Sequence, residues 1–514
     1  MSKDKHTLPA ARELHIGVVG AGVMGRGIAQ LFLQAGYPVR LYDAQAEARD
    51  RAAEFIDNML ERQVAKGKYT RSEADTMLAG LTRCHAIDEL ASCRVVIEAV
   101  VELPDVKRQL FAELEQIVSA EAILASNTSS LLVSDIAAAC TRPARVAGLH
   151  FFNPAPLMRV VEVIPATLTD AAVVEQLSAL VASTGHRAVV AADQPGFLVN
   201  HAGRGYVTEA LRILEEGVAQ PEDIDRVMRE AMGFRMGPFE LLDLTGLDVS
   251  GKVMQSIYDQ FMQEPMYRPS ALVAPRLAAG LFGRKTGRGF YRYEDDRKVE
   301  PEQAPAPKVT YMKVWLDDEA GAVSWQLAEE LQAAGARIMD SPVAVDTMVL
   351  LQTWGNDVSQ QCAESGLDPL RAVALDPLPG LDKRRTLMLS PVTAPQVRDS
   401  MHGLLAAGGV PVTVINDSPG FISQRILAVI VNIAANIAQR RIASVSDIEA
   451  AVTLGLGYPQ GPLSWGDEVG TEAIVEILEN LHDQTLDPRY RLSPWLRRRD
   501  LCGVPLLTEE VDRG

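Results

Sequence analysis

A histidine and a glutamate in two neighbouring apolar segments are the residues of this chain best suited to proton transfer. His150 closes a short apolar run, and Glu162 lies inside the next one, between Val161 and Val163. Burying a carboxylate in such a run is costly unless it has a partner. A histidine can be that partner, with one ring nitrogen bonded to the carboxylate and the other taking a substrate proton. Two interpretations are open: a catalytic pair, or a core histidine with satisfied hydrogen bonds.

A polar segment upstream of this pair has the composition of a ligand site. Residues 126–130, S-N-T-S-S, follow the apolar run Ala122–Ala125, which predicts a short strand. Open α/β sheets bind ligands beyond the carboxyl ends of their strands, so these hydroxyl and amide groups are candidates for substrate contacts. The alternative is a helix cap, a position that serine and threonine also favour.

A glycine-rich turn near the N-terminus predicts the elements that would place a nucleotide cofactor. The apolar, β-branched run Leu14–Val19 predicts a strand, and the pattern G-x-G-x-x-G follows it and opens a helix. The first glycine allows a tight bend, the second lets a pyrophosphate approach the backbone, and the third lets the helix pack against the strand. The N-terminus of the helix would then offer its free N–H groups to the phosphates. The predicted cofactor contacts here are Gly20, Gly22, Val23, Met24, Gly25 and Asp43.

Asp43 indicates which nucleotide is bound. It ends a second predicted strand, Val39–Tyr42, roughly 20 residues after the glycines, where a carboxylate can bond both ribose hydroxyls. The carboxylate would repel a 2′-phosphate, and Ala44 follows it rather than an arginine, so the sequence favours NAD over NADP. The full pattern of strand, glycines, helix, strand and acid is far more specific than the glycines alone, for which an ordinary glycine-rich turn is the alternative.

The composition is typical of a soluble protein with several domains. The chain has 514 residues, of which 47% are hydrophobic and 23% charged. No apolar run reaches about 18 residues, and no signal-peptide core is visible, so we expect a cytoplasmic protein that binds no membrane. A net charge of −17 argues against nucleic acid as a partner. The five cysteines are scattered, without a C-x-x-C, and predict reduced thiols rather than disulfides or a metal site.

Three motifs resemble those of the L-3-hydroxyacyl-CoA dehydrogenase family. They are G-L-H-F-F-N-P (148–154), the S-N-T-S-S segment and D-Q-P-G-F-L-V-N (193–200), and the resemblance extends from about Leu14 to Tyr293. It implies a Rossmann-type NAD domain, a helical domain, and NAD-dependent oxidation of an (S)-3-hydroxyacyl-CoA to the 3-oxoacyl-CoA. Members with two copies include 3-hydroxyadipyl-CoA and 3-hydroxybutyryl-CoA dehydrogenases, so an acyl-CoA substrate of that kind is implied.

The resemblance also implies roles for single residues. His150 matches the catalytic base and Glu162 its partner. Ser129 and Asn200 match the substrate-oxygen and active-site positions. Lys66 matches a basic position that contacts coenzyme A, although the basic cluster around it could also be a solvated helix face. The family's NAD-contacting positions fall on Glu102, Lys107, Asn153 and Lys285.

Part of the first half of the chain recurs in the second half at one constant spacing. The recurring residues are Asp193, Pro195, Gly196, Phe197, Gly233, Gly237, Pro238, Asp243 and Gly246, which return as Asp417, Pro419, Gly420, Phe421, Gly457, Gly461, Pro462, Asp467 and Gly470. The constant spacing predicts that residues 417–514 are a second copy of the helical domain. We expect the two copies to pack against each other as the subunits of a homodimer would. Whether the whole chain also forms a homo-oligomer is open.

The second copy lacks the predicted chemistry. Residues 309–416 contain no G-x-G-x-x-G, and Asp376 stands where His150 would fall in a decayed version of its motif. Gln424 replaces Asn200. The missing residues favour structural support as the role of this half, with a second binding site as the alternative.

The predicted fold class is α/β plus all-α. The predicted segments are an NAD-binding Rossmann-type domain (1–193), a helical domain (194–293), a charged, proline-rich linker (294–308), a degenerate α/β domain (309–416) and a second helical domain (417–514). Two other functions stay open: an NAD-dependent dehydrogenase of a free hydroxy acid, and a non-catalytic NAD-binding subunit.

Overall fold

The computed structural model describes residues 14–317 and 322–510. The chain forms two compact units. The first unit consists of the residues up to His201 together with Arg440–Leu456, and the second unit contains the remaining residues. A segment of the second helical repeat therefore belongs to the same unit as the glycine-rich turn.

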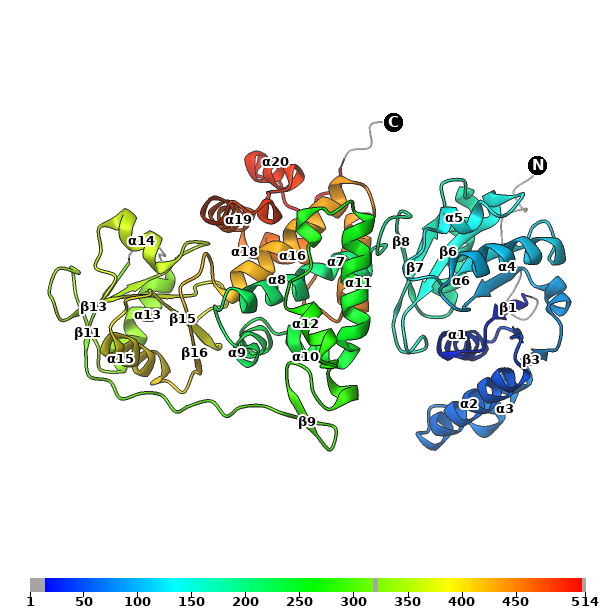
Figure 1. Ribbon diagram of the computed structural model, residues 1–514, viewed down its shortest axis with the longest axis horizontal. Coiled ribbons are helices and arrows are strands. Elements are labelled where there is room, and N and C mark those ends of the chain that lie inside the picture. Colours follow the sequence, from blue (N-terminus) through cyan, green and yellow to red (C-terminus); the bar gives the residue numbers. More distant parts are fainter. Residues whose placement is uncertain (1–13, 318–321, 511–514) are drawn as a thin grey trace. The chain divides into compact units, whose positions relative to one another are not determined.

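An eight-stranded sheet forms the centre of the first unit (Figure 1). Its strands are β1 (Ile16–Val19), β2 (Val39–Tyr42), β3 (Leu81–Cys84), β4 (Val95–Glu98), β5 (Ile123–Ser126), β6 (Val146–Phe151), β7 (Val160–Pro165) and β8 (Arg187–Val190). They lie in the order β3-β2-β1-β4-β5-β6-β7-β8, and β7 and β8 run opposite to the other six. β1, β4 and β5 are buried along their whole length, as parallel strands covered on both faces are.

Helices cover this sheet. They are α1 (Val23–Gln34), α2 (Ala46–Ala65), α3 (Arg71–Ala79), α4 (Pro104–Ile117), α5 (Val133–Ala137), α6 (Ala171–Ser183) and, from the second repeat, α17 (Val445–Ala450). Phe32 of α1, Leu60 of α2 and Leu177 of α6 are buried in one core with the sheet. Gly36, at φ +85°, follows the end of α1 in the conformation that suits a glycine there.

A second, six-stranded sheet lies in the second unit. Its strands are β11 (Lys313–Leu316), β12 (Arg337–Ile338), β13 (Thr347–Leu351), β14 (Ala372–Leu375), β15 (Arg385–Leu389) and β16 (Val412–Ile415), and its helices are α13 (Ala322–Ala333), α14 (Val358–Ser365) and α15 (Pro395–Ala406). The order is β12-β11-β13-β14-β15-β16. β15 runs antiparallel to β14 and parallel to β16, as β7 does to β6 and β8. The predicted fold class, with a smaller second α/β sheet, is confirmed.

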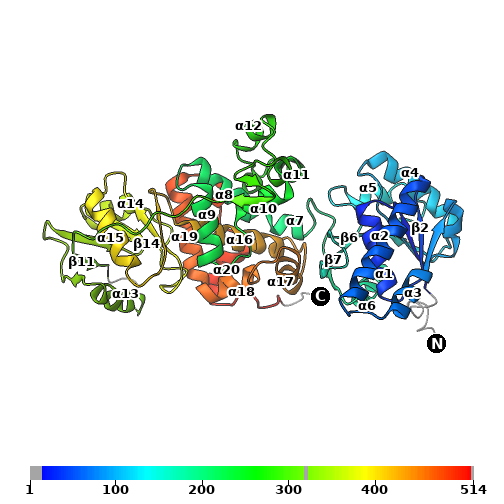
Figure 2. The same ribbon diagram turned by 90° about the horizontal axis from the view of Figure 1, so that it is seen from below.

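Two sets of helices make up the helical copies. The first set is α7 (Val199–Ala202), α8 (Arg204–Glu215), α9 (Pro221–Arg226), α10 (Pro238–Thr245), α11 (Leu247–Gln260) and α12 (Val273–Ala278), and the second is α16 (Ile422–Gln439), α17, α18 (Pro462–Val469), α19 (Thr471–Thr485) and α20 (Pro494–Cys502). α8 packs directly against α16 (Figure 2). A Cβ at Gly205 of α8 would lie 3.2 Å from side-chain atoms of Val429 and Ile433, so the glycine allows this close approach.

α16 is the central helix of this packing. Within the described residues it is the one helix long and apolar enough to cross a bilayer by length and composition, and 89% of it is buried. It also carries Arg425, whose guanidinium lies 2.7 Å from Glu209 and 2.6 Å from Glu216, both from the first copy. Tyr490 accepts a further hydrogen bond from Arg425. α16 is therefore a core helix, joined to the first copy by a buried ion pair with Glu209 and a partly exposed one with Glu216.

Both recurring pairs of aspartates, Asp193 with Asp417 and Asp243 with Asp467, have a structural explanation. Asp193 accepts hydrogen bonds from the first two backbone N–H groups of α5, and Asp417 does the same for α14. Asp243 accepts from two consecutive N–H groups further along its own copy, and Asp467 does so in the other copy. The repeat thus preserves carboxylates that hold the backbone.

The beginning of the predicted linker is folded rather than extended. β9 (Arg292–Glu294) and β10 (Arg297–Val299) form an antiparallel hairpin across this boundary. Lys298 of β10 pairs with Glu240 of α10, and Glu300, just after β10, lies 2.9 Å from Arg226 of α9. These ion pairs hold the start of the predicted linker against the helical domain. The charge and proline content of the segment do not show which partners are nearby, so they did not predict this contact.

Candidate active site

The three glycines of the turn have different surroundings. Gly20 has φ +101°, and a Cβ there would lie 2.5 Å from the carbonyl oxygen of Ala99. A Cβ at Gly25 would lie 1.7 Å from the carbonyl oxygen of Gly20, so α1 could not start so close to β1 with a larger residue. No atom lies within 4 Å of a Cβ placed at Gly22. The fold therefore requires the first and third glycines, whereas the second leaves the backbone open to a ligand.

A cavity of about 660 Å³ lies beside this turn and is lined by Gly20, Gly22, Val23, Met24 and Asp43 among others. The first turn of α1 contains no acidic residue, so its free N–H groups can attract phosphate. The Asp43 carboxylate accepts one hydrogen bond from the N–H of Ala21 and one from that of Gln45. These contacts fix the carboxylate at the cavity wall. The residues fit the pyrophosphate and ribose of NAD.

The pairing of β6 with β7 places His150 directly opposite Glu162. His150 Nδ1 lies 2.5 Å from Glu162 Oε2. Glu162 is fully buried and His150 is 5% exposed. The rings of Phe152 and Phe197 lie 4.4 and 5.8 Å from the imidazole, centroid to centroid. The carboxylate and the two rings restrict the orientation of the imidazole, and Nδ1 is the ring nitrogen that faces the carboxylate.

The second oxygen of Glu162 is also bonded. Oε1 accepts hydrogen bonds from the N–H of Leu198 at 2.8 Å and of Val199 at 2.7 Å. Val199 begins α7, and Asn200 is the next residue. One carboxylate therefore connects the catalytic candidate His150 to the start of the helix that carries Asn200.

A buried ion-pair cluster lies at the carboxyl ends of β4 and β5. Lys107 Nζ lies 2.6 Å from Glu98 and 3.1 Å from Glu102. Lys107 and Glu98 are 1% and 0% exposed, whereas the side chain of Glu102 is 36% exposed. Ser126 donates to the second oxygen of Glu98. The Lys107 ammonium pairs with both carboxylates. Glu102 is the partly exposed member of the cluster.

Glu102 also organises the S-N-T-S-S segment. It accepts hydrogen bonds from the Thr128 hydroxyl at 2.6 Å and from the N–H of Ser129 at 2.9 Å. Burial acts to raise the pKa of Glu102, but Lys107 and these hydrogen bonds outweigh it and lower the pKa. Ser129 itself is exposed. It lies just beyond the carboxyl end of β5, the strand that pairs with β6. The negative carboxylate thus fixes the loop that presents Ser129.

The remaining predicted residues are Asn153, Lys66 and Lys285. Asn153 is exposed just beyond β6, and Lys66 is exposed at the end of α2. Lys285 lies in the second unit, where it pairs with Asp248. In the part of the chain that the structure describes, no group of three or more His, Cys, Asp or Glu could hold a metal ion.

Sequence reasoning did not assign a role to Glu98 or to the N–H groups of Leu198 and Val199. Glu98 ends an apolar strand, and a carboxylate that must be buried beside apolar residues, as with Glu162, is the signal that could have indicated it. The backbone donors give no signal, because any residue could supply them.

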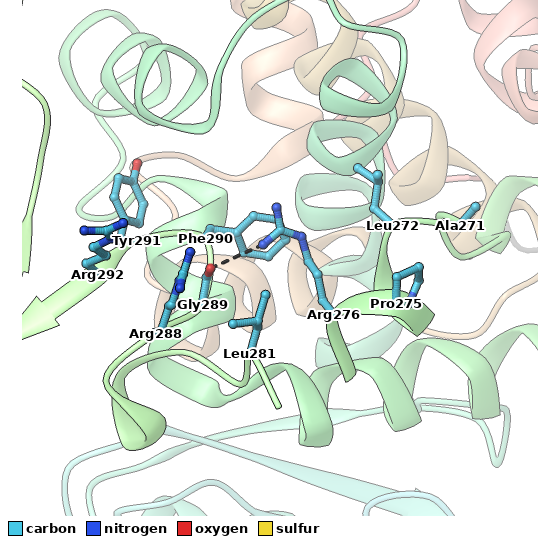
Figure 3. A pocket seen from close by; sticks show the side chains of 10 residues that line it. All are labelled: Ala271, Leu272, Pro275, Arg276, Leu281, Arg288, Gly289, Phe290, Tyr291 and Arg292. Carbon is cyan, nitrogen blue, oxygen red and sulfur yellow. Dashed lines mark hydrogen bonds between the residues drawn. The ribbon is translucent and has the colours of Figure 1, made fainter. Parts of the chain in front are cut away.

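Another cavity, of about 580 Å³, lies in the first helical copy (Figure 3). Arg276, Arg288 and Arg292 are among its lining residues. The Arg276 guanidinium lies over the ring of Phe290 and donates to the carbonyl of Gly289. None of the predicted site residues lines this cavity, so the candidate active site is the His150–Glu162 pair of the first unit.

Comparisons with known proteins agree with these features. Residues 15–194 match the family model of the 3-hydroxyacyl-CoA dehydrogenase NAD binding domain, and residues 196–293 and 420–503 both match that of the 3-hydroxyacyl-CoA dehydrogenase C-terminal domain. The double match confirms the internal repeat.

Similar proteins include both long and short chains. The 3-hydroxyadipyl-CoA dehydrogenase of Escherichia coli K12 is 37% identical over 95% of this chain and 97% of its own length. A probable 3-hydroxybutyryl-CoA dehydrogenase of Bacillus subtilis is 40% identical over 54% of this chain and 97% of its own length. A crystal structure of 3-hydroxybutyryl-CoA dehydrogenase from E. coli K12 has a TM-score of 0.84 at 35% identity, covering 96% of this chain and 99% of that one.

Proposed function

This chain belongs to the 3-hydroxyacyl-CoA dehydrogenase family, and we propose that it oxidises its substrate through the His150–Glu162 pair. Family membership makes it an NAD-dependent enzyme that acts on 3-hydroxyacyl-CoA. The observation that supports the mechanism is the 2.5 Å contact between His150 Nδ1 and Glu162 Oε2, within a carboxylate whose other oxygen is held by two N–H groups.

In this mechanism His150 is the general base. Nε2 takes the proton of the 3-hydroxyl as C3 gives up its hydride. Bound NAD supplies the hydride acceptor. Glu162 keeps the proton on Nδ1 and stabilises the imidazolium that forms, as the carboxylate of a catalytic triad does. General-base catalysis of this kind is typically worth roughly 10²–10⁴ in rate.

Ser129 and Asn200 are proposed to hydrogen-bond the substrate oxygens. The support for this proposal is the position of the two residues. Ser129 is exposed just beyond the carboxyl end of β5, in the sheet that holds His150, and Asn200 follows the two residues whose N–H groups bind Glu162. A hydrogen bond that strengthens as charge develops on the oxygen would lower the barrier.

The proposed NAD contacts follow from the cavity. Gly20 and Gly22 line the cavity and would hold the pyrophosphate over the start of α1, with Val23 and Met24 beside it, and Asp43 would bond the ribose. Gly25 is proposed from the glycine pattern, in which it lets α1 start close to β1. Contacts from Glu102, Lys107, Asn153 and Lys285 to NAD, and from Lys66 to coenzyme A, are proposed from the family resemblance.

For the substrate we propose an acyl-CoA of the 3-hydroxyadipyl or 3-hydroxybutyryl kind. Relatives with both names are similar to this chain, and a 3-hydroxyadipyl-CoA dehydrogenase matches both of its halves. We also propose a cytoplasmic enzyme, since the described cysteines are all free thiols.

A substrate panel tests this proposal. (S)-3-hydroxyacyl-CoA thioesters with short, long and dicarboxylic acyl groups would be compared with the free hydroxy acids, with NADH absorbance as the readout. We expect turnover of thioesters only. Turnover of a free hydroxy acid at a similar kcat/KM would favour the alternative dehydrogenase, and no turnover of any thioester would contradict the proposal.

A further inference from the structure

A segment of the second helical copy, residues 440–456, belongs to the unit that contains His150 and Glu162. It consists of α17, the π-helical turn Ala451–Gly455 and their flanking residues. We infer that this segment is a positioning element of the active site: it holds β7 and the start of α7 in place and, through them, the Glu162 carboxylate. The inference rests on the proposed function in taking Glu162 as the partner of the catalytic base.

The first contact is along β8, the edge strand of the sheet. The carbonyl of Ile442 accepts a hydrogen bond of 2.7 Å from the N–H of Ala192. The Asp447 carboxylate accepts from Arg187 at 2.9 Å and from the N–H of Val190 at 3.2 Å. β8 pairs with β7, which carries Glu162. These bonds therefore hold in place the strand that flanks β7.

Apolar packing also holds the segment. Ile448 and Ala451 are fully buried, and Val452 is 1% exposed. Close-packed interiors transmit small shifts because they contain little free volume. A change in this segment is therefore expected to reach the strand beneath it.

Gly455 contacts both elements that hold Glu162. A Cβ at this position would lie 3.0 Å from Val160 and 3.2 Å from Val199. Val160 begins β7, and the N–H of Val199 is one of the two donors to Glu162 Oε1. A side chain at Gly455 would therefore push against the strand that carries the carboxylate and against the helix start that binds it.

The first helical copy makes the matching contact with the second sheet. The N–H of Asn416, after β16, donates to the carbonyl of Val218, and Arg384 lies 2.8 Å from Glu230. Ala231 stands at the repeat position of Gly455. Each helical copy thus supports the α/β sheet of the other half of the chain. Only one of the two sheets carries a His–Glu pair, so the second contact is a built-in control.

A steric pair of variants in the full chain tests the inference. Gly455→Val is expected to lower kcat about tenfold or more, because small displacements of catalytic groups have large kinetic effects. The KM for NAD should change less than about twofold, since the glycine turn is untouched. Ala231→Val adds atoms at the equivalent buried position, and kcat should stay within about twofold of the unmodified enzyme.

A double-mutant cycle separates positioning from general damage. If Gly455→Val acts through Glu162, then in a Glu162→Gln background it should cost less than about a further twofold in kcat, because the two changes are not independent. Additive losses, or an unchanged kcat for Gly455→Val alone, would overturn the inference. An unchanged kcat for Glu162→Gln would instead overturn the proposed function.

A charge pair covers the case in which Gly455→Val does not fold. Asp447→Asn removes the charge that binds Arg187, and Glu230→Gln removes the charge that binds Arg384. We expect a several-fold loss of kcat from the first variant and none from the second. Equal effects on kcat, or none from either, would show that the segment does not position the site.

Discussion

The two α/β sheets share a scaffold and differ where the first one holds its polar pair. His150 faces Glu162 across β6 and β7. At the matching place in the second sheet, the N–H of Asp376 bonds the carbonyl of Thr386, and the Asp376 carboxylate is bonded by Ser423 and Gln424. Ser423 and Gln424 thus occupy the Asp376 carboxylate, and the second cluster lacks a histidine.

This difference separates scaffold from chemistry. Asp193 and Asp417 hold equivalent helix starts in both halves. His150, Glu162 and Asn200 have no counterparts of the same type. The repeat keeps aspartates that bind backbone groups, and it loses the three residues that we propose take part in catalysis.

The largest expected effect comes from His150→Gln. It should lower kcat by roughly 10²–10⁴, since the general base is removed, and leave NAD binding nearly intact. Asp376→Asn, at the matching place in the second sheet, should leave kcat unchanged. Steady-state kinetics and NAD titration check both variants. A kcat of His150→Gln close to that of the unmodified enzyme would remove this residue from the role.

The next effect concerns the contact between the helical copies. Arg425→Ala leaves Glu209 buried without its main partner and should lower the free energy of unfolding by about 3–5 kcal/mol. Arg491→Ala breaks an exposed ion pair with Glu264, also between the copies, and should cost no more than about 1 kcal/mol. Denaturant unfolding measures both values. Similar losses of stability for the two variants would show that the buried Arg425–Glu209 pair contributes no more than an exposed one.

Asp43→Ala should weaken NAD binding about tenfold or more, because hydrogen bonds to charged groups are worth about 1.5–3 kcal/mol. Discrimination against NADP should relax with it, since the repulsive charge is gone. The kcat/KM values for the two cofactors give the result, with Gln45→Ala as the neighbouring control. Undiminished preference for NAD would argue against the ribose contact.

The smallest effect is a pH dependence of stability. Burial raises the pKa of Asp376 to about 6, outweighing its hydrogen bonds. The folded state then binds an extra proton between about pH 4 and pH 6, so the stability from this group is present below about pH 4 and lost as pH rises through about 6. Asp376→Asn should remove this loss. The difference in unfolding midpoint between this variant and the unmodified enzyme should grow in favour of the variant as the pH rises from about 4 to about 6. A difference that does not change with pH would contradict the raised pKa.

Local chemistry made part of the molecule predictable. The run of strand, glycines and helix could be predicted because Gly20 and Gly25 are the residues that this geometry requires. Glu162 was a candidate because a carboxylate in an apolar run needs a partner, and the structure places His150 there. The catalytic role itself stays a proposal.

The missed features depend on distant neighbours. β3 is a short edge strand with exposed Thr82 and Arg83, so no apolar run marks it in the sequence. The assignment of residues 440–456 to the first unit leaves no mark in the sequence of that segment. Contacts between parts of the chain far apart in sequence decide both, and no local pattern encodes them.

The packing of α8 on α16 has a consequence for synthesis of the chain. The ribosome releases α8 long before α16, so the apolar surface of the first copy is without its cover while the rest is being made. Such uncovered surface is prone to aggregation and is a target for chaperones. Nascent chains that stop short of α16 should therefore expose this apolar surface and depend more on chaperones than the full-length chain does.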